Sequence, residues 1–186
     1  VKERAKAEAA LLLPVVVLRT VPETVIATKR RIGEPRPVVK KIALSKNFLF
    51  GSKTDRFRRA IHDVDADQTG WSALCDVLPA APLEELIVAD VGMGVTGVTS
   101  LAKAISSMAA INSLALGSNP IGDEAMIHLL DVLKDVSLTS FDISKTNCGV
   151  STATKLAELL AEETKFKATV ARLTLNGNKI TGKKWN

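Results

Sequence analysis

The chain has 186 residues, of which 46% are hydrophobic and only 4% aromatic. This apolar content excludes disorder throughout the chain, and it predicts one domain with an aliphatic core together with a tail or cap. The apolar run at residues 9–18 is interrupted by Pro14 and is half as long as the roughly 20 residues that a membrane span needs. We therefore expect no membrane span.

The net charge of +5 is unevenly distributed. Residues 1–60 carry 15 Lys or Arg and 5 Asp or Glu, whereas residues 61–186 carry 10 and 15. We expect residues 1–38 to form a basic, proline-containing arm that binds RNA, an anionic lipid surface or an acidic protein groove, or that is simply solvated. The basic residues expected to contact an anionic partner are Lys29, Arg30, Arg31, Arg36, Lys40 and Lys41.

The two cysteines, Cys75 and Cys148, lie in apolar segments without metal-ligand spacing. This favours two core thiols over a disulfide, and hence an intracellular, reducing compartment whose organelle stays open. Because the chain begins with Val, we expect a processed form or a fragment.

An apolar pattern of the form L-x-x-L-x-L-x-x-N-x-L recurs along the chain, starting at residues 39, 83, 111, 138 and 170. Between the last four copies the starts are 28, 27 and 32 residues apart. A weaker copy at Ile61, Val64, Ala66, Thr69 and Trp71 would divide the gap between the first two. The residues at the pattern positions are Val39, Ile42, Leu44, Asn47, Leu49; Leu83, Leu86, Val88, Val91, Met93; Ile111, Leu114, Leu116, Asn119, Ile121; Leu138, Phe141, Ile143, Thr146, Cys148; and Val170, Leu173, Leu175, Asn178, Ile180.

Each copy predicts a short strand whose middle two apolar residues point inward, followed by a turn in which the asparagine bonds backbone groups. Stacked copies would form a parallel sheet on the inner side of an arc and helices on the outer side, around one core. Apolar residues at helical spacing indicate those helices at 98–105, 125–133 and 153–160. Glycines at 94, 122 and 149 suggest turn positions with positive φ. The expected fold class is therefore α/β, a solenoid of repeats.

The pattern resembles the long-repeat class of leucine-rich-repeat proteins, which includes ribonuclease inhibitor, the Ran GTPase activating protein and innate-immune receptor domains. The resemblance covers residues 83–180 well, 39–82 poorly and 1–38 not at all. It implies an arm at 1–38, a degenerate first repeat or insertion at 39–82, and a repeat domain at 83–186. Proteins of this class hold protein partners on the concave face or its flanks. Val91, Thr69 and Thr146 depart from the asparagine position, and Asn147 could serve through a one-residue slip.

Gly92, Gly94 and Gly97 spell G-x-G-x-x-G between a predicted strand and a helix, as in a dinucleotide-binding fold. The acidic residue required about twenty positions later is missing, so structural glycines are the preferred interpretation. A P-loop-like G-x-x-x-x-G-K ends at Lys183, but Lys184 stands where Ser or Thr is needed.

Asp65, Asp67, Thr69, Gly70 and Asp76 match positions 1, 3, 5, 6 and 12 of a calcium-binding EF-hand loop. The final position normally carries a bidentate Glu, and Pro79 would shorten the exiting helix. We interpret the segment as a weak calcium candidate, formed by Asp65, Asp67, Thr69 and Asp76, or as an irregular repeat.

The sequence contains two histidines and no recognisable Ser-His-Asp pattern. His62 and His128 are expected to be surface or packing residues. We expect no catalytic residues and no cofactor.

Residues that flank the inward positions of each strand are expected to form the concave face, which is built of small side chains and suits a broad, shallow contact. The chain stops soon after its last strand, so we expect it to be part of a larger protein or to be buttressed by neighbours. The expected function is a non-catalytic protein-interaction or scaffold module, a structural subunit or adaptor. Alternatives are an RNA-contacting subunit of a ribonucleoprotein and a dinucleotide-binding enzyme fragment. The expected concave-face residues are Glu85, Ile87, Ala89, Ser113, Ala115, Gly117, Ser140, Asp142, Ser144, Arg172, Thr174 and Asn176.

Overall fold

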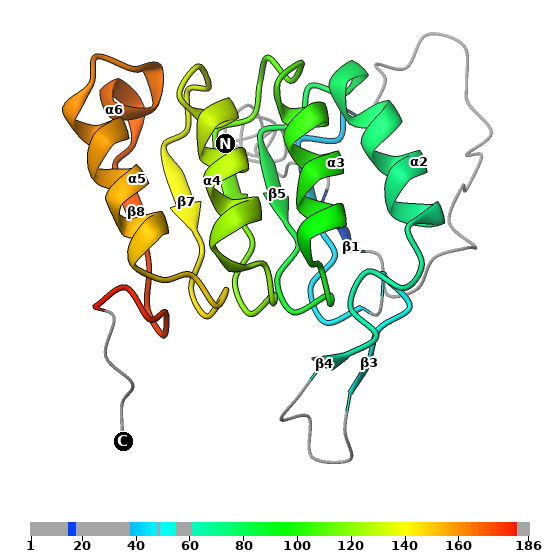
Figure 1. The fold of residues 1–186 in the computed structure, drawn as a ribbon. Helices are drawn as coiled ribbons and strands as arrows, with labels where there is room; N and C mark the ends of the chain where they lie inside the picture. The colour runs from blue at the N-terminus through cyan, green and yellow to red at the C-terminus, as the bar shows by residue number, and fades with distance from the viewer. Residues whose placement is uncertain (1–14, 18–37, 48, 55–60, 182–186) are drawn as a thin grey trace, which may run out of the picture.

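A computed structural model of the chain describes residues 15–17, 38–47, 49–54 and 61–181 as a mixed α/β structure. Its strands are short, and from β4 to β7 a helix follows each strand (Figure 1). The elements in chain order are β1 (Val15–Val17), β2 (Lys41–Ala43), β3 (Lys53–Thr54), β4 (Ile61–His62), α2 (Thr69–Val77), the 3₁₀ helix η1 (Leu78–Ala80), β5 (Glu85–Ile87), α3 (Val95–Ile105), β6 (Ser113–Ala115), α4 (Gly122–Leu133), β7 (Ser140–Asp142), α5 (Val150–Ala161), α6 (Lys165–Thr169) and β8 (Arg172–Thr174).

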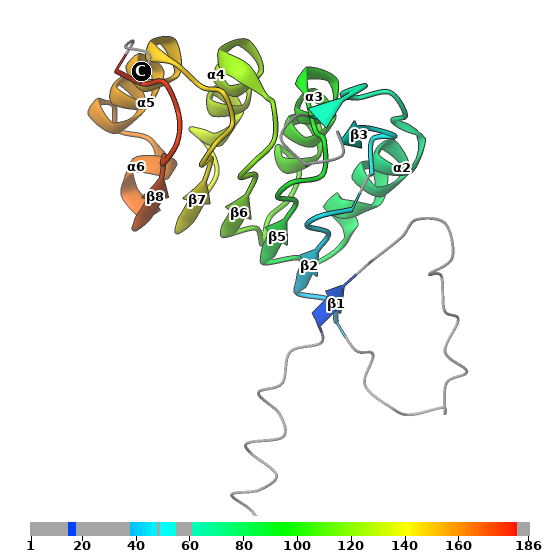
Figure 2. The same cartoon turned by 90° about the horizontal axis from the view of Figure 1, so that it is seen from below.

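Six of these strands form one parallel sheet, in the order β1-β2-β5-β6-β7-β8 in which the chain visits them. Helices α2 to α5 lie on the same side of this sheet (Figure 2). Neighbouring strands lie about 4.8 Å apart, whereas packed helices need 8–10 Å. The array therefore curves, with the sheet on the inner side.

Equivalent positions of the apolar pattern lie opposite one another in neighbouring strands. Ile42 pairs with Leu86, Leu86 with Leu114, Leu114 with Phe141, and Phe141 with Leu173. The first four are buried, and Leu173 packs against the same core. The expectation that these positions share one interior is confirmed.

The turn after each strand contains a left-handed residue at the same place in all five copies of the pattern. Lys46, Asp90, Ser118, Lys145 and Gly177 have φ values of 62°, 56°, 61°, 54° and 74°, and each directly precedes the asparagine position. A left-handed residue costs free energy unless it is glycine, so the surrounding bonds must hold it.

The asparagine of the pattern supplies those bonds and joins successive turns of the chain. The fully buried Asn119 accepts hydrogen bonds at Oδ1 from the N–H groups of Val91 and Met93, both at 3.1 Å. Its Nδ2 donates to the carbonyls of Val88 (2.7 Å) and Leu116 (2.8 Å).

Asn178 repeats the arrangement two strands further on, after β8, where its amide bonds backbone groups of Thr146, Cys148, Ile143 and Leu175. In the copy between them, the buried Thr146 hydroxyl donates to Ile143 at 2.8 Å. The expectation that Asn147 replaces the pattern asparagine through a one-residue slip was therefore wrong, because Asn147 is exposed, with φ 60°.

The helices follow the expected spacing with one correction. In α3 and α4 the expected apolar residues are buried. In α5 the buried positions are Thr152, Leu156 and Leu159, whereas Ala157 and Leu160, both expected in the core, are exposed. The inward face of α5 therefore includes Thr152, whose hydroxyl donates to the carboxylate of Asp123.

The weaker copy expected at Ile61 does not form, because β2 pairs directly with β5. Ile61 lies in a small antiparallel pair, β3–β4, and Trp71 lies in α2. The Trp71 indole donates to the Gly97 carbonyl at 2.9 Å, and its ring lies 5.4 Å from that of Phe50. Residues 39–82 thus contribute one strand of the large sheet, followed by the small strand pair, α2 and η1.

Strand β1 extends the sheet into the segment expected to be an arm, because Val16 pairs with Ile42. In the sequence, Leu13, Val16 and Leu18 fit the first three apolar positions of the pattern, 26 residues before Val39. Other expected arm residues, including Lys29, Arg30, Arg31 and Arg36, lie outside the described residues.

Replacing Asn119 with Ala is expected to lower the free energy of unfolding by about 3 kcal/mol or more, because four buried backbone groups lose their partner. Urea denaturation measures the change. Asn176→Ala removes an exposed amide of the same type and should change stability by less than about 0.5 kcal/mol. Equal effects of the two substitutions would contradict the role given to Asn119.

Candidate functional site

The residues expected on the concave face form aligned rows across the sheet. Side chains alternate along a strand, so residues on either side of a buried position point away from the helices. Within the described part of the chain no helix or strand covers this face (Figure 2). One row is Glu85, Ser113, Ser140 and Arg172, and the next is Ile87, Ala115, Asp142 and Thr174.

The other expected face residues lie two positions beyond the ends of the strands: Ala89, Gly117, Ser144 and Asn176. A Cβ at Gly117 would lie 2.8 Å from the Ser144 hydroxyl, so this part of the face is tightly packed. Most face residues are half-buried, whereas Arg172 and Asn176 are exposed. The face is therefore shallow, broad and built of small side chains. We refer to it as the open face.

Few charges lie on the open face, and those at its β2 end are paired. Lys41 Nζ lies 2.9 Å from Glu85 Oε2, and Lys40 at the strand entry lies 2.6 Å from Glu84 Oε1. Lys40 and Lys41, expected to act with the arm on an anionic partner, are thus partnered by acidic side chains of the next turn. At the other end, Arg172 makes no ion pair within the described residues.

The G-x-G-x-x-G segment is filled by protein groups. The Asp65 carboxylate accepts hydrogen bonds from the N–H groups of Gly94 (2.8 Å), Thr96 (2.8 Å) and Gly97 (3.3 Å) at the start of α3. A dinucleotide needs the same helix N-terminus for its pyrophosphate. A phosphate would have to displace Asp65 and meet its negative charge, which argues against the dinucleotide alternative.

The glycines allow the small strand pair and its flanks to approach this helix. A Cβ at Gly94 would lie 2.8 Å from Asp65 Oδ2, and one at Gly97 would lie 2.7 Å from the Phe50 ring. Gly92 has φ 78° and approaches Ser52. The preference for structural glycines agrees with this packing.

Asp123 performs the same task for α5 as Asp65 does for α3. Its Oδ1 accepts from the Gly149 N–H (2.6 Å), the Thr152 N–H (3.2 Å) and the Thr152 hydroxyl. Burial opposes ionisation of this carboxyl, but the hydrogen bonds from Thr152 and Gly149 outweigh it and hold its pKa below the ordinary value. The positive φ expected for Gly94 and Gly149 was wrong, since both are extended and are small to admit a carboxylate. Only Gly122 of the three has positive φ, at 80°.

The calcium interpretation is not supported by this arrangement. The described residues contain no group of three or more His, Cys, Asp or Glu that could hold a metal ion. Asp65 caps α3, and Asp67 Oδ1 accepts from the Thr69 N–H at 2.9 Å. Asp76 lies near the end of α2. In the P-loop-like segment, Gly182 and Lys183 lie outside the described residues.

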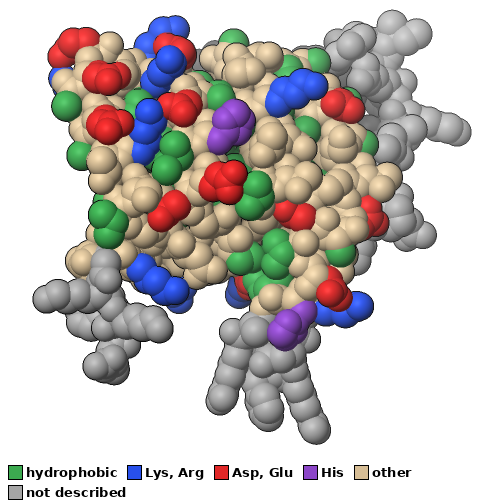
Figure 3. All heavy atoms as spheres, viewed as in Figure 1, with side chains coloured by type: hydrophobic (Ala, Val, Ile, Leu, Met, Phe, Trp, Pro, Cys, Tyr) green, Lys and Arg blue, Asp and Glu red, His purple; other side chains and the backbone are tan. Residues whose placement is uncertain are grey.

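In the described residues, the two cysteines lie in the core and the two histidines lie at the surface. Cys75 and Cys148 are buried free thiols, as expected, and burial raises the pKa of Cys75 to about 12. Burial raises the pKa of Cys148 as well. His62 and His128 are exposed, on β4 and α4 (Figure 3).

Comparisons with known proteins add information on the fold. No protein-family model matches the chain, and no curated protein matches it. Among solved structures, it is similar to "Leiomodin-1 Actin-Binding Site 2 (ABS2)", with a TM-score of 0.51 and 20% identity. The match covers 59% of this chain and 64% of that one, so the chain spans less than two thirds of its neighbour. Within the described residues, no helix has the length and apolar character needed to cross a bilayer.

Replacing Asp123 with Asn is expected to lower the free energy of unfolding by about 0.5–1 kcal/mol at pH 7, because the α5 cap loses its charge. The folded pKa is depressed, so this stabilisation is present above about pH 4, the unfolded value, and disappears as the pH falls through the folded pKa. Urea denaturation from pH 7 to pH 3 tests both statements.

Glu124→Gln is the matched control, because Glu124 lies in the same helical turn and its exposed carboxylate accepts no hydrogen bond in the described part of the chain. Glu124→Gln should change the free energy of unfolding by less than half as much as Asp123→Asn does. A difference between wild type and Asp123→Asn that stays constant down to pH 3 would contradict the cap.

Proposed function

We propose that the chain is a leucine-rich-repeat solenoid of the long-repeat class that binds protein partners on its open face, as a non-catalytic scaffold or adaptor subunit. The regular register, the left-handed turn residues and the hydrogen-bonded amides of Asn119 and Asn178 support the repeat assignment. The two buried thiols support a reducing, intracellular setting.

A single observation carries the functional part of the proposal. Sheets made entirely of parallel strands usually have both faces covered. Here helices α2 to α5 lie on one side, and the other side presents aligned rows of small, half-buried side chains (Figure 2). Such a face loses little side-chain entropy when a partner covers it.

The similar solved structure is, by its printed name, an actin-binding site. At 20% identity the likeness concerns the fold, so actin serves as one named probe for the open face, and the partner class we propose is protein.

The proposal is tested with the double variant Ser113→Arg and Ser140→Glu, at paired positions in the middle of the open face. The new charges lie beside Glu85 and Arg172, so each gains an oppositely charged neighbour and the net charge is unchanged. Bulky charged side chains at the centre of an interface should weaken partner binding at least tenfold. Affinity capture from native extract, followed by titration of the captured partner and of purified actin, measures the loss.

The matched control is Ser151→Glu and Ala157→Arg, two exposed positions on α5 at the outer surface. It should retain every partner, and both double variants should melt within a few degrees of the wild type. Retention of all partners by the open-face variant would overturn the proposal. Loss caused instead by replacing Lys29, Arg30, Arg31 and Arg36 with Gln, with binding that weakens steeply in salt, would favour the RNA alternative.

A further inference from the structure

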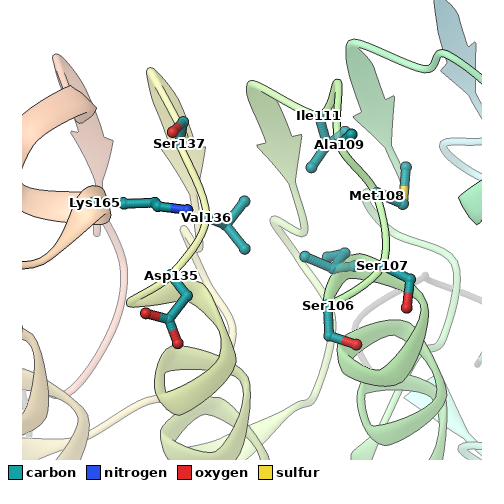
Figure 4. Close-up of a pocket in the computed structure, with 10 residues that line it drawn as sticks. Ser106, Ser107, Met108, Ala109, Ile111, Asp135, Val136, Ser137 and Lys165 are labelled. Carbon is teal, nitrogen blue, oxygen red and sulfur yellow. The ribbon is translucent and has the colours of Figure 1, made fainter.

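Two adjoining hollows run along the edge where the outer helices end, away from the open face. One lies between α2 and α3 and has a volume of about 490 Å³. The other, of about 370 Å³, lies between the ends of α3 and α4 and the start of α6 (Figure 4). Ser106 and Ser107 line both hollows, so the two adjoin at the end of α3, and we refer to them together as the groove.

Four exposed charged side chains line this groove, with signs that alternate from turn to turn. Asp76 on α2 and Lys103 on α3 line the first hollow, and Asp135 after α4 and Lys165 on α6 line the second. Lys165 extends from α6 toward Val136, with Asp135 on the same side of the hollow (Figure 4). Each hollow thus contains one acid and one base.

None of these four side chains makes an ion pair within the described residues, although other lysines of the outer surface do. Lys155 lies 2.7 Å from Asp131, and Lys167 lies 2.7 Å from Glu163. The groove charges are therefore available to a partner. An exposed charge that is not already paired can form a new ion pair without first breaking an old one.

The remaining lining of the groove suits a polypeptide. Buried Met108 and Ile111 form an apolar floor in one hollow, and Cys75 and Ala104 do so in the other. Serine hydroxyls, which can bond a peptide backbone, lie around these apolar patches at positions 72, 100, 107 and 137.

The spacing of the charges sets the spacing of a matching sequence. Neighbouring helices pack about 8–10 Å apart, and an extended chain advances about 3.3 Å per residue. An extended partner that crosses one helix therefore advances by about three residues. At each step the partner needs a side chain whose charge is opposite to that of the groove. From α2 to α6 its side chains are therefore basic, acidic, basic and acidic.

We propose that this groove binds an extended protein segment of the form basic-x-x-acidic-x-x-basic-x-x-acidic. Asp76 and Asp135 pair with its basic side chains, and Lys103 and Lys165 pair with its acidic ones. The groove is separate from the open face, so it provides a second contact for a partner and can be tested alone.

The test uses two labelled ten-residue peptides of identical composition and the full chain. In one, Lys and Glu alternate at every third position with Ser between them, and in the other the two Lys come before the two Glu. The alternating peptide matches all four groove charges, whereas the blocked peptide meets two like charges. Because each exposed ion pair strengthens binding only modestly, we expect the alternating peptide to bind at least threefold more tightly by fluorescence anisotropy at low salt.

A charge rearrangement makes the test specific. Lys103→Glu with Asp135→Lys keeps the net charge and converts the groove to two acids followed by two bases. This double variant should prefer the blocked peptide by a similar factor. The matched control, Lys155→Glu with Asp131→Lys, exchanges an ion pair of the outer surface and should keep the wild-type order.

An unchanged preference in the rearranged groove would overturn the proposal, as would equal binding of both peptides to the wild type. Competition of the alternating peptide by an RNA oligonucleotide alone, and not by unlabelled alternating peptide, would also overturn it. The open-face variant Ser113→Arg with Ser140→Glu should bind the alternating peptide as the wild type does, so failure of one proposal does not decide the other.

Discussion

The side-chain amides of Asn119, which is fully buried, and of Asn178, which is half-buried, hold successive turns of the chain in register. The left-handed residues after each strand leave backbone N–H and C=O groups without backbone partners inside the protein. Each such buried group without a hydrogen bond lowers the free energy of unfolding by about 1–3 kcal/mol. One asparagine amide bonds four of these groups, in its own strand loop and in the preceding one. The alignment of strands, and with it the two surfaces that we propose to bind partners, depends on this bonding.

Carboxylates provide a second link between turns, on the outer side of the sheet. Asp65 and Asp123 each leave their own turn to cap the helix of the next one. Because a helix N-terminus attracts anions, an uncapped α3 behind G-x-G-x-x-G would have suited a phosphate. The protein supplies its own anion there, so the motif is a packing feature.

The strand positions could be predicted because the apolar side chains that recur at fixed places in each copy are the ones buried in the core. Five of the six strands of the sheet follow from this pattern alone. Strand β1 was missed because its segment keeps only three pattern positions, one of them beside Pro14.

The helix caps were missed because Asp65 lies 29 residues away from Gly94, from whose N–H it accepts a hydrogen bond. The open-face rows follow from alternation along a strand, whereas the pairing of Lys41 with Glu85 was missed because a weaker copy was expected between their strands. The groove escaped prediction because its charges come from four separate segments of the chain.

The carboxylate caps also bear on how such a chain can be shortened or lengthened during evolution. Asp65 and Asp123 can each cap only a helix that begins with a glycine, because a side chain there would collide with the carboxylate. The position in α3 that matches Asp123 is Val95. Helix α3 is therefore capped by Asp65 but carries no carboxylate that could cap the next helix. Loss of that turn alone would bring Asp65 against a helix start that already carries Asp123 and Glu124, and the like charges would repel. If strand–helix units are gained or lost two at a time, every capping carboxylate still meets a helix start that can accept it. Duplication of units in pairs therefore disturbs the caps least.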